Sequence, residues 1–307
     1  MKLLFRNILP LLALLLGAPG IARTTEVDLP APSQGDLKVE ADVLSMFLED
    51  GTPYEEIVLR FRTDKLKFYR QASGTFLAEY KPELVIRDPE GNVVKSLGGG
   101  VSQLELGTEG DTQDPTRTFS DMVQIQLPPG TYEAELSIED AHSGTRAKQT
   151  LAVDVPAREE GGLALSDIYF ADQVDPPAEG RLEMFRKGGR IIVPDPTRTF
   201  SSKGTVAFYA TVRNLARRIH SIHVEILDSF DQVVLSDRRS YPAYRNQAHL
   251  VEGFSLRDLL PGTYRLRLTA RANDDESVVV RAFRVEGATP TVSDRFDDAA
   301  VQAMKKV

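Results

Sequence analysis

Residues that could perform chemistry are sparse in this chain. It has four histidines and no cysteine among 307 residues, which excludes disulfides, thiolate nucleophiles and every zinc or iron–sulfur site that needs cysteine. His220 and His223 lie three residues apart in a segment with strand character, so their side chains would point to opposite faces and could not share a metal ion. We therefore expect no metal site and no cofactor.

Two acidic segments, residues 109–114 and 274–276, could offer carboxylate oxygens to calcium, but neither has the spacing of an EF-hand loop. The chain also lacks the Gly-x-Ser-x-Gly elbow of α/β-hydrolases and the Gly-x-x-x-x-Gly-Lys loop that cradles phosphates. We expect no catalytic residues, and we expect that the protein is not an enzyme. A secreted hydrolase built from scattered residues is the least favoured alternative.

One seven-residue segment occurs twice. Asp-Pro-Thr-Arg-Thr-Phe-Ser spans residues 114–120 and again residues 195–201. In one interpretation the two copies are recognition loops that present an arginine and a phenylalanine to a ligand. The candidate interaction residues are then Arg117, Phe119, Arg198 and Phe200. In the favoured interpretation Asp-Pro starts a turn, and Thr-Arg-Thr-Phe leads into a strand whose phenylalanine faces the core.

The N-terminus has the pattern of a secretory signal. Lys2 and Arg6 precede the apolar run 8–16, and Gly20 and Ala22 suit the −3 and −1 positions of a signal peptidase site. The apolar run is shorter than the roughly 20 residues needed to span a bilayer, although an uncleaved anchor is the alternative. We expect residues 1–22 to be a signal peptide, residues 23–36 a linker, and the mature protein to be extracytoplasmic with no transmembrane segment.

Length and composition favour two packed domains. Hydrophobic residues make up 41% of the chain and charged residues 27%, which is enough apolar material for a core. A chain of 307 residues suits about two domains. The net charge is −8, and a nucleic-acid partner is excluded because it would require clustered lysine and arginine.

Most of the chain between residues 37 and 286 alternates apolar and polar residues with a period of two, and turn residues separate the runs. The order of these signals repeats. The hairpin at 85–94 is echoed at 224–234, and Pro-Gly-Thr-Tyr occurs at 129–132 and 261–264. A duplicated set of short strands predicts an all-β protein with two tandem immunoglobulin-like or fibronectin-III-like sandwiches. Each repeated tyrosine could be a tyrosine corner, or simply an aromatic residue that suits a strand.

We place the first sandwich at residues 37–156 and the second at 163–286, joined by a short charged and glycine-rich linker. Residues 171–204 show no clear strand pattern, so we expect an irregular and functional segment there. Residues 288–307 contain an amphipathic pattern that predicts a short C-terminal helix. Its apolar stripe comprises Phe296, Ala299, Ala300, Ala303, Met304 and Val307.

Several stretches also carry a family resemblance. The longest is Arg-Ile-Ile-Val-Pro-Asp-Pro-Thr-Arg-Thr-Phe at 190–200. The others are residues 42–44, 51–54, 88–94, 163–168, 253–254 and 260–264. Over about residues 37–286 the chain resembles the N-terminal region of bacterial GWxTD domain-containing proteins. The resemblance implies an exported two-sandwich scaffold that leads into a helical domain with a Gly-Trp-x-Thr-Asp motif. The chain has no tryptophan, so it lacks that motif, and its tail resembles the first helix of that domain.

We therefore expect a non-catalytic exported module that binds a protein partner in the cell envelope or serves as a scaffold there. A glycan-binding accessory module is the alternative. Tyr241 and Tyr244 would then supply the aromatic surface on which sugar rings pack, since the chain has no tryptophan.

Overall fold

The computed structural model describes residues 28–157, 161–175, 181–215, 220–241 and 246–287. The predicted signal peptide and the predicted C-terminal helix lie outside these ranges. Within them the chain consists mainly of strands, and its helices are the short α1 (Glu109–Gln113), η1 (Thr63–Lys65) and η2 (Arg181–Phe185). No described helix is both long enough and apolar enough to cross a bilayer. The predicted all-β fold is confirmed.

The first sandwich has a seven-stranded and a three-stranded sheet, both antiparallel. The larger sheet has the order β1 (Gln34–Gly35), β10 (Arg146–Val155), β9 (Gly130–Asp140), β5 (Phe76–Arg87), β4 (Tyr69–Arg70), and β6 (Val93–Leu97) and β7 (Ser102–Leu106) also pair with β5. The smaller sheet has the order β2 (Val39–Phe47), β3 (Pro53–Arg62), β8 (Thr118–Ile125). Strand β1 lies inside the predicted linker 23–36. It extends the larger sheet by pairing with β10.

The second sandwich has a six-stranded and a five-stranded sheet. The first has the order β11 (Ala164–Leu165), β16 (Thr205–Arg213), β12 (Tyr169–Asp175), β14 (Arg190–Pro194), β13 (Arg186–Lys187), with β19 (Gln247–Ser255) also on β16. The second has the order β15 (Thr199–Ser201), β21 (Asp275–Glu286), β20 (Gly262–Ala272), β17 (His220–Leu227), β18 (Val233–Tyr241). Only the β15–β21 pair is parallel among these described pairings.

The prediction of an irregular segment at 171–204 is wrong, because that segment contributes strands to both sheets of the second sandwich. Strand β14 escapes a period-two reading because the consecutive residues Ile191, Ile192 and Val193 are all buried. A strand whose two faces are both covered reads as a continuous apolar run.

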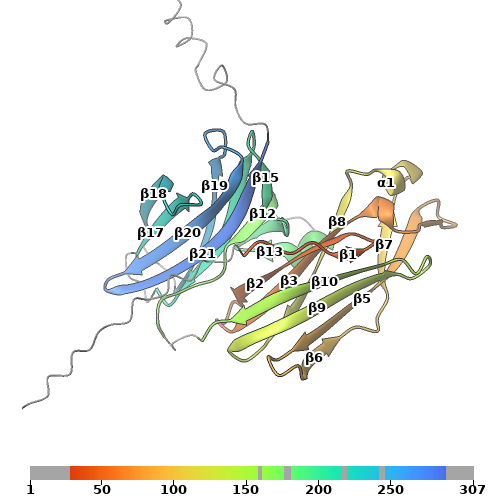
Figure 1. Ribbon diagram of the computed structural model, residues 1–307, viewed down its shortest axis with the longest axis horizontal. Coiled ribbons are helices and arrows are strands. Elements are labelled where there is room, and N and C mark those ends of the chain that lie inside the picture. The colour runs from red at the N-terminus through yellow and green to blue at the C-terminus, as the bar shows by residue number, and fades with distance from the viewer. Residues whose placement is uncertain (1–27, 158–160, 176–180, 216–219, 242–245, 288–307) are drawn as a thin grey trace, which may run out of the picture.

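The two sandwiches form the two lobes of Figure 1. Each sandwich has its own core between its two sheets. A third core joins the sandwiches, because β2 and β3 of the first pack against β12, β14 and β16 of the second. Its buried members are Leu44, Met46, Tyr54, Val58, Tyr169, Ala171, Ile192 and Tyr209. The sandwiches are therefore packed face to face and not merely strung on a linker.

The repeated turns make the same hydrogen bonds in both sandwiches. In the two hairpins, the carboxylates of Asp88 and Asp228 accept from the backbone N–H of Asn92 and Gln232, both at position i+4. The two Pro-Gly-Thr-Tyr turns are tyrosine corners. Tyr132 donates its hydroxyl to the carbonyl of Pro128 at 3.0 Å, and Tyr264 donates to Leu260 at 2.8 Å.

The corner hydrogen bond of the second sandwich should contribute measurably to stability. Tyr264 is only 8% exposed, and its hydroxyl tethers the turn before β20. We expect Tyr264→Phe to lower the free energy of unfolding by about 0.5–1.5 kcal/mol, the usual net value of one hydrogen bond. Urea denaturation measures the change. Tyr69→Phe is the matched control, since Tyr69 is exposed and should change stability by less than about 0.5 kcal/mol. Equal effects of the two changes would contradict the role assigned to the corner.

Candidate functional site

The two copies of the repeated heptapeptide fold into the same turn. In each, the aspartate accepts hydrogen bonds from the backbone N–H and the hydroxyl of the threonine two residues later. Phe119 is 7% exposed and belongs to the core of the first sandwich. Phe200 packs on the core of the second, against Phe170 and Phe283. Neither ring is offered to a ligand, so the structure has the turn-to-strand arrangement with phenylalanine facing inward.

The two arginines of the repeat differ in their surroundings. Arg117 is exposed and pairs with Asp111 in helix α1. Arg198 is 3% exposed and has a left-handed backbone with φ 51°. Its guanidinium donates two hydrogen bonds to the carboxylate of Asp42 in the first sandwich, from Nε to Oδ2 at 2.8 Å and from Nη2 to Oδ1 at 2.7 Å. Arg198 therefore joins the sandwiches instead of forming a recognition loop.

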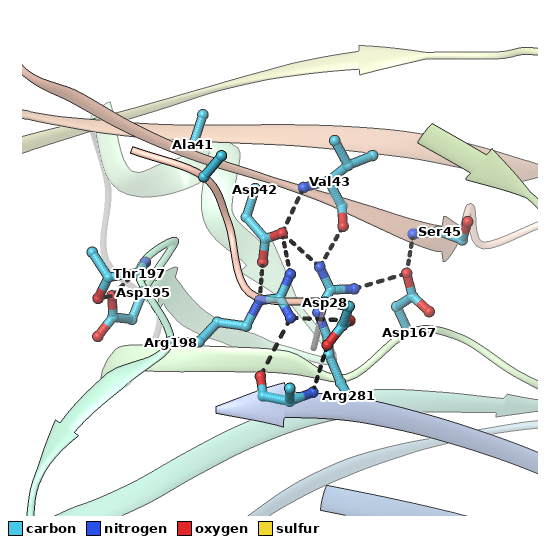
Figure 2. A network of polar contacts seen from close by, with 12 residues as sticks. Asp28, Ala41, Asp42, Val43, Ser45, Asp167, Asp195, Thr197, Arg198 and Arg281 are labelled. Carbon is cyan, nitrogen blue, oxygen red and sulfur yellow. Dashed lines mark hydrogen bonds and ion pairs between the residues drawn. The ribbon is translucent and has the colours of Figure 1, made fainter. Parts of the chain in front are cut away.

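Asp42 lies at the centre of a polar network, which we call the polar junction and define as Asp28, Asp42, Asp167, Arg198 and Arg281 (Figure 2). Asp42 and both arginines are buried, whereas the side chain of Asp28 is 53% exposed. Arg281 on β21 donates to Asp42 Oδ1 at 2.7 Å and to Asp167 at 2.9 Å. Arg198 also donates to Asp28 at 3.1 Å. Two arginines thus hold carboxylates from the segment before β1, from β2 and from the loop before β12.

The polar junction also completes the outer edge of β2. Along this edge the N–H and C=O groups of every second residue point away from β3 and would otherwise lack partners. The carbonyl of Val43 accepts from Arg281, and the N–H of Ser45 donates to Asp167 (Figure 2). In turn, the backbone N–H of Asp167 donates to the carbonyl of Ser45 at 2.8 Å. Residues of the second sandwich therefore cap a strand edge of the first.

A glycine lets a further arginine reach across the interface. Arg213 on β16 donates to the carbonyl of Leu48 at 2.8 Å in the turn between β2 and β3. A Cβ on Gly51 would lie 2.3 Å from the Arg213 guanidinium, and Gly51 has φ 99°. The backbone conformation favours glycine, and a side chain at position 51 would displace the Arg213 guanidinium. The Gly51-Thr52-Pro53-Tyr54 stretch of the family resemblance thus has a structural role at the interface.

Electrostatics in the polar junction favour the charged state of Asp42. Burial alone would raise the pKa of Asp42, but the charges of Arg281 and Arg198 and the hydrogen bonds from Arg198 outweigh it. The pKa of Asp42 consequently lies below its ordinary value of 3.8. A carboxylate with a lowered pKa in the folded state adds stability above the unfolded pKa and loses it in more acidic solution.

This shift predicts an acid-labile interface. The contribution of Asp42 should be complete above about pH 4 and should disappear as the pH falls through the lower folded pKa. Urea unfolding measured from about pH 6 down to about pH 2 should show this loss. Asp42→Asn should flatten that part of the profile, because asparagine has no proton to gain. An unchanged slope in this variant would contradict the assignment.

A second buried polar cluster lies within the third core. Lys187 on β13 donates to Glu56 on β3 at 2.7 Å, and their side chains are 6% and 0% exposed. The hydroxyl of Tyr54 donates to the same carboxylate at 3.0 Å, and the Lys187 ammonium sits 4.9 Å from the centre of the Tyr169 ring. Burial, together with the charge of Glu56, raises the pKa of Tyr54 and of Tyr169.

This cluster contains a carboxylate, an amine and phenols, which are groups that catalyse reactions elsewhere. Here they are closed off, since Glu56, Lys187, Tyr54 and Tyr169 are all at most 7% exposed. Tyr209 closes one side and bonds His249 Nδ1 at 2.8 Å. Burial, partly offset by the hydroxyl of Thr211, raises the pKa of Tyr209 to about 12. These groups therefore lie inside the interface between the sandwiches.

The remaining predicted candidates lie elsewhere. Residues 109–113 form helix α1, in which Thr108 and Asp111 make a capping box, so the acidic segment serves a helix start. Tyr241 is the last residue of β18, and its side chain and all of Tyr244 fall outside the described residues. Among the described residues no three His, Asp or Glu side chains are close enough together to hold a metal ion.

The residues that build the interface were missed by sequence reasoning. Asp42, Glu56 and Lys187 are polar residues on strands, and alternation would place such residues in solvent. A signal was nevertheless present, because Asp42, Glu55 and Glu56 lie in strands that carry apolar residues on both faces. Charged residues in a doubly buried strand imply charged partners, and buried charges are almost always paired.

No family model matches the chain, and none of the curated proteins matches it. Among solved structures it is similar to a β-glucuronidase of Parabacteroides merdae, at 10% identity and a TM-score of 0.25, over 76% of this chain and 28% of that one. It is also similar to dimeric latent PorU of Porphyromonas gingivalis, at 13% identity and a TM-score of 0.31, over 84% of this chain and 20% of that one. The chain spans less than a third of the length of either.

Proposed function

We propose that the protein is an exported, non-catalytic scaffold that holds two β-sandwiches in one fixed orientation and binds a protein partner in the cell envelope. The observation that carries the proposal is the interface between the sandwiches. It combines an apolar core with two sets of buried ion pairs, Lys187–Glu56 and the polar junction. Ion pairs buried in this way have demanding geometry, so they favour one arrangement of the two sandwiches over any other.

The burial of the potentially reactive side chains in the second cluster supports a role other than catalysis. A catalytic acid, base or nucleophile must contact its substrate. The phenols, carboxylate and amine of the second cluster are instead enclosed between β3, β12, β13 and β16. Their contacts stabilise the packing of one sandwich on the other, which is the property a scaffold needs.

Export is proposed from the pattern at residues 1–22, and the family resemblance agrees with it. The segment 190–200, which carries most of that resemblance, supplies Ile192 to the third core and Arg198 to the polar junction. Asp195 adds a cross-sandwich pair with Arg60 at 3.1 Å. We therefore propose that the resemblance to the GWxTD N-terminal region reflects the way in which two sandwiches are joined.

Cross-linking in the native cell envelope tests this function. The full chain with a C-terminal tag should be recovered from the envelope fraction with a cleaved N-terminus at Arg23 and with a stoichiometric protein partner. A matched chain that lacks residues 1–22 should stay in the cytoplasm and should not recover that partner. A protein that is retained in the cytoplasm, or that remains monomeric and without a cross-linked partner in the envelope, would overturn the proposal.

A further inference from the structure

A cleft of about 1150 Å³ opens beside the polar junction, between β10 of the first sandwich and β21 of the second. Small-molecule sites usually enclose about 300–1,000 Å³, so this cleft is large enough for a longer ligand. Its lining combines strand edges with the segments 28–31 and 162–165, and Asp42, Arg198 and Arg281 also line it. The interface that fixes the two sandwiches therefore also fixes the width of this cleft.

The edge of β21 that faces the cleft is only partly covered. Leu165 of β11 lies beside it and donates its N–H to the hydroxyl of Ser277 at 3.1 Å. Ala282 donates its N–H to Asp28 and accepts at its carbonyl from Arg198, so its backbone groups point away from β20. Because backbone groups alternate sides every second residue, those of Val280 and Val278 also point outward. Strand β15 covers this edge only at residues 284–286. In the described part of the chain no strand pairs with the stretch 276–280 on that side.

The opposite wall has the same character. The carbonyl of Arg146 on β10 points away from β9 and accepts from the N–H of Leu37. Because backbone groups alternate sides along a strand, those of Thr150, Ala152 and Asp154 also point away from β9. These three residues line the cleft, and no described strand pairs with them on this side. Unpaired strand edges are templates for a further strand, and proteins usually cover or blunt them.

The charge of the cleft selects among extended segments. Its lining includes eight carboxylates and only two guanidinium groups, those of Arg198 and Arg281. Both guanidinium groups are already engaged by Asp28, Asp42 and Asp167. The rim residues Asp154, Asp274 and Glu276 are exposed and add further negative charge. Such a cleft attracts cations and repels acidic segments.

Apolar surface lies within the same wall. Val278 and Val280 on β21 are 48% and 44% exposed, although valine in a strand is usually packed. In a strand added to this edge, every second side chain would pack on Val278 and Val280. The intervening side chains would be free to contact the carboxylates of the cleft. A five-residue stretch such as 276–280 accepts a segment of about 17 Å at about 3.3 Å per residue.

We propose that this cleft binds an extended, cationic segment of a partner protein, which adds as a strand to the edge of β21. The occupant is a run in which lysine or arginine alternates with β-branched residues. Main-chain hydrogen bonds to Val278 and Val280 supply affinity, and the carboxylates of the rim supply specificity. This inference rests on the proposed function and assigns it a site and a partner chemistry.

A model peptide tests the inference directly. The probe is acetyl-(Lys-Val)4-amide with a fluorescent label, and its acidic counterpart is acetyl-(Glu-Val)4-amide. In fluorescence anisotropy at low salt we expect the basic peptide to bind the full chain at least about 10-fold more tightly, and to lose affinity as salt rises. Methylating alternate backbone nitrogens of the basic peptide should abolish binding, because these donors form the ladder.

Hydrogen exchange shows where the peptide lies without any substitution in the protein. Strand addition should slow exchange of the Val278 and Val280 amides in the complex. Val280→Lys should weaken binding about 5-fold or more, through repulsion in the cleft. Val234→Lys is the matched control, since Val234 is 45% exposed on β18 outside the cleft, and its effect should stay below about 2-fold.

Three results would overturn the inference. The first is that neither peptide binds. The second is that the basic peptide binds without protecting the Val278 and Val280 amides from exchange. The third is that a second copy of the chain protects these amides at high protein concentration. Recovery of an envelope partner whose binding leaves these amides unprotected would reject this site while keeping the proposed scaffold function. If the chain binds the peptide but recovers no envelope partner, the proposed function would be rejected and this binding site would be kept.

Discussion

Replacing Lys187 with methionine is expected to lower the free energy of unfolding by about 3–5 kcal/mol. Lys187 is the cation that compensates Glu56, and both side chains are buried in the third core. Without the ammonium, the carboxylate stays in an apolar interior with only neutral phenol partners, such as the hydroxyl of Tyr54 at 3.0 Å. Urea denaturation of the full chain measures the loss.

Two controls separate a stranded charge from lost packing. The double substitution Lys187→Met with Glu56→Leu should recover most of the stability, since replacing both partners of a buried pair with apolar residues is often neutral. Lys148→Met removes an exposed partner of Glu135 and should cost less than about 1 kcal/mol. A Lys187→Met protein no less stable than Lys148→Met would show that the buried pair contributes little to joining the sandwiches.

The first sandwich, excised as residues 28–157, is expected to be markedly less stable than it is in the full chain. Excision exposes Leu44, Met46 and Val58, which are at most 2% exposed in the intact protein. Burying each such side chain is worth about 1.5–3 kcal/mol, so about 4.5–9 kcal/mol of stabilisation would be lost. That is comparable to the entire stability of an ordinary domain, which is about 5–15 kcal/mol.

The excised sandwich should therefore bind a hydrophobic dye and unfold at lower urea concentration than the full chain. Changing Leu44 and Met46 to threonine in the excised protein should reduce dye binding while preserving its β-sheet circular dichroism. Threonine suits an exposed strand position, and these two side chains would no longer have a partner to pack against. An excised sandwich as stable as the full chain would mean that the two modules are independent.

The sequence contained much of the information about each sandwich and little about how the two are joined. Hairpins and tyrosine corners depend on residues within five positions of each other, such as Tyr264 and Leu260, so their chemistry is visible in the local order of residues. Asp42 instead depends on Arg198 and Arg281, which lie 156 and 239 residues away. No local period reveals partners at that separation.

The repeated heptapeptide shows the same limit within one motif. Both copies make the same turn, because the aspartate–threonine hydrogen bonds are local. Arg117 nevertheless stays in solvent, whereas Arg198 is buried against the other sandwich. Identical sequence thus produced identical local structure and opposite burial, because burial depends on what the fold packs against each copy.

The cooperativity of thermal unfolding tests most directly whether the two sandwiches form one body. Calorimetry of the mature chain should give a single transition with a calorimetric enthalpy equal to the van't Hoff enthalpy, because opening the interface exposes the third core and the buried ion pairs together. Two resolved transitions, or a calorimetric enthalpy about twice the van't Hoff value, would show that the sandwiches unfold separately and would contradict the account.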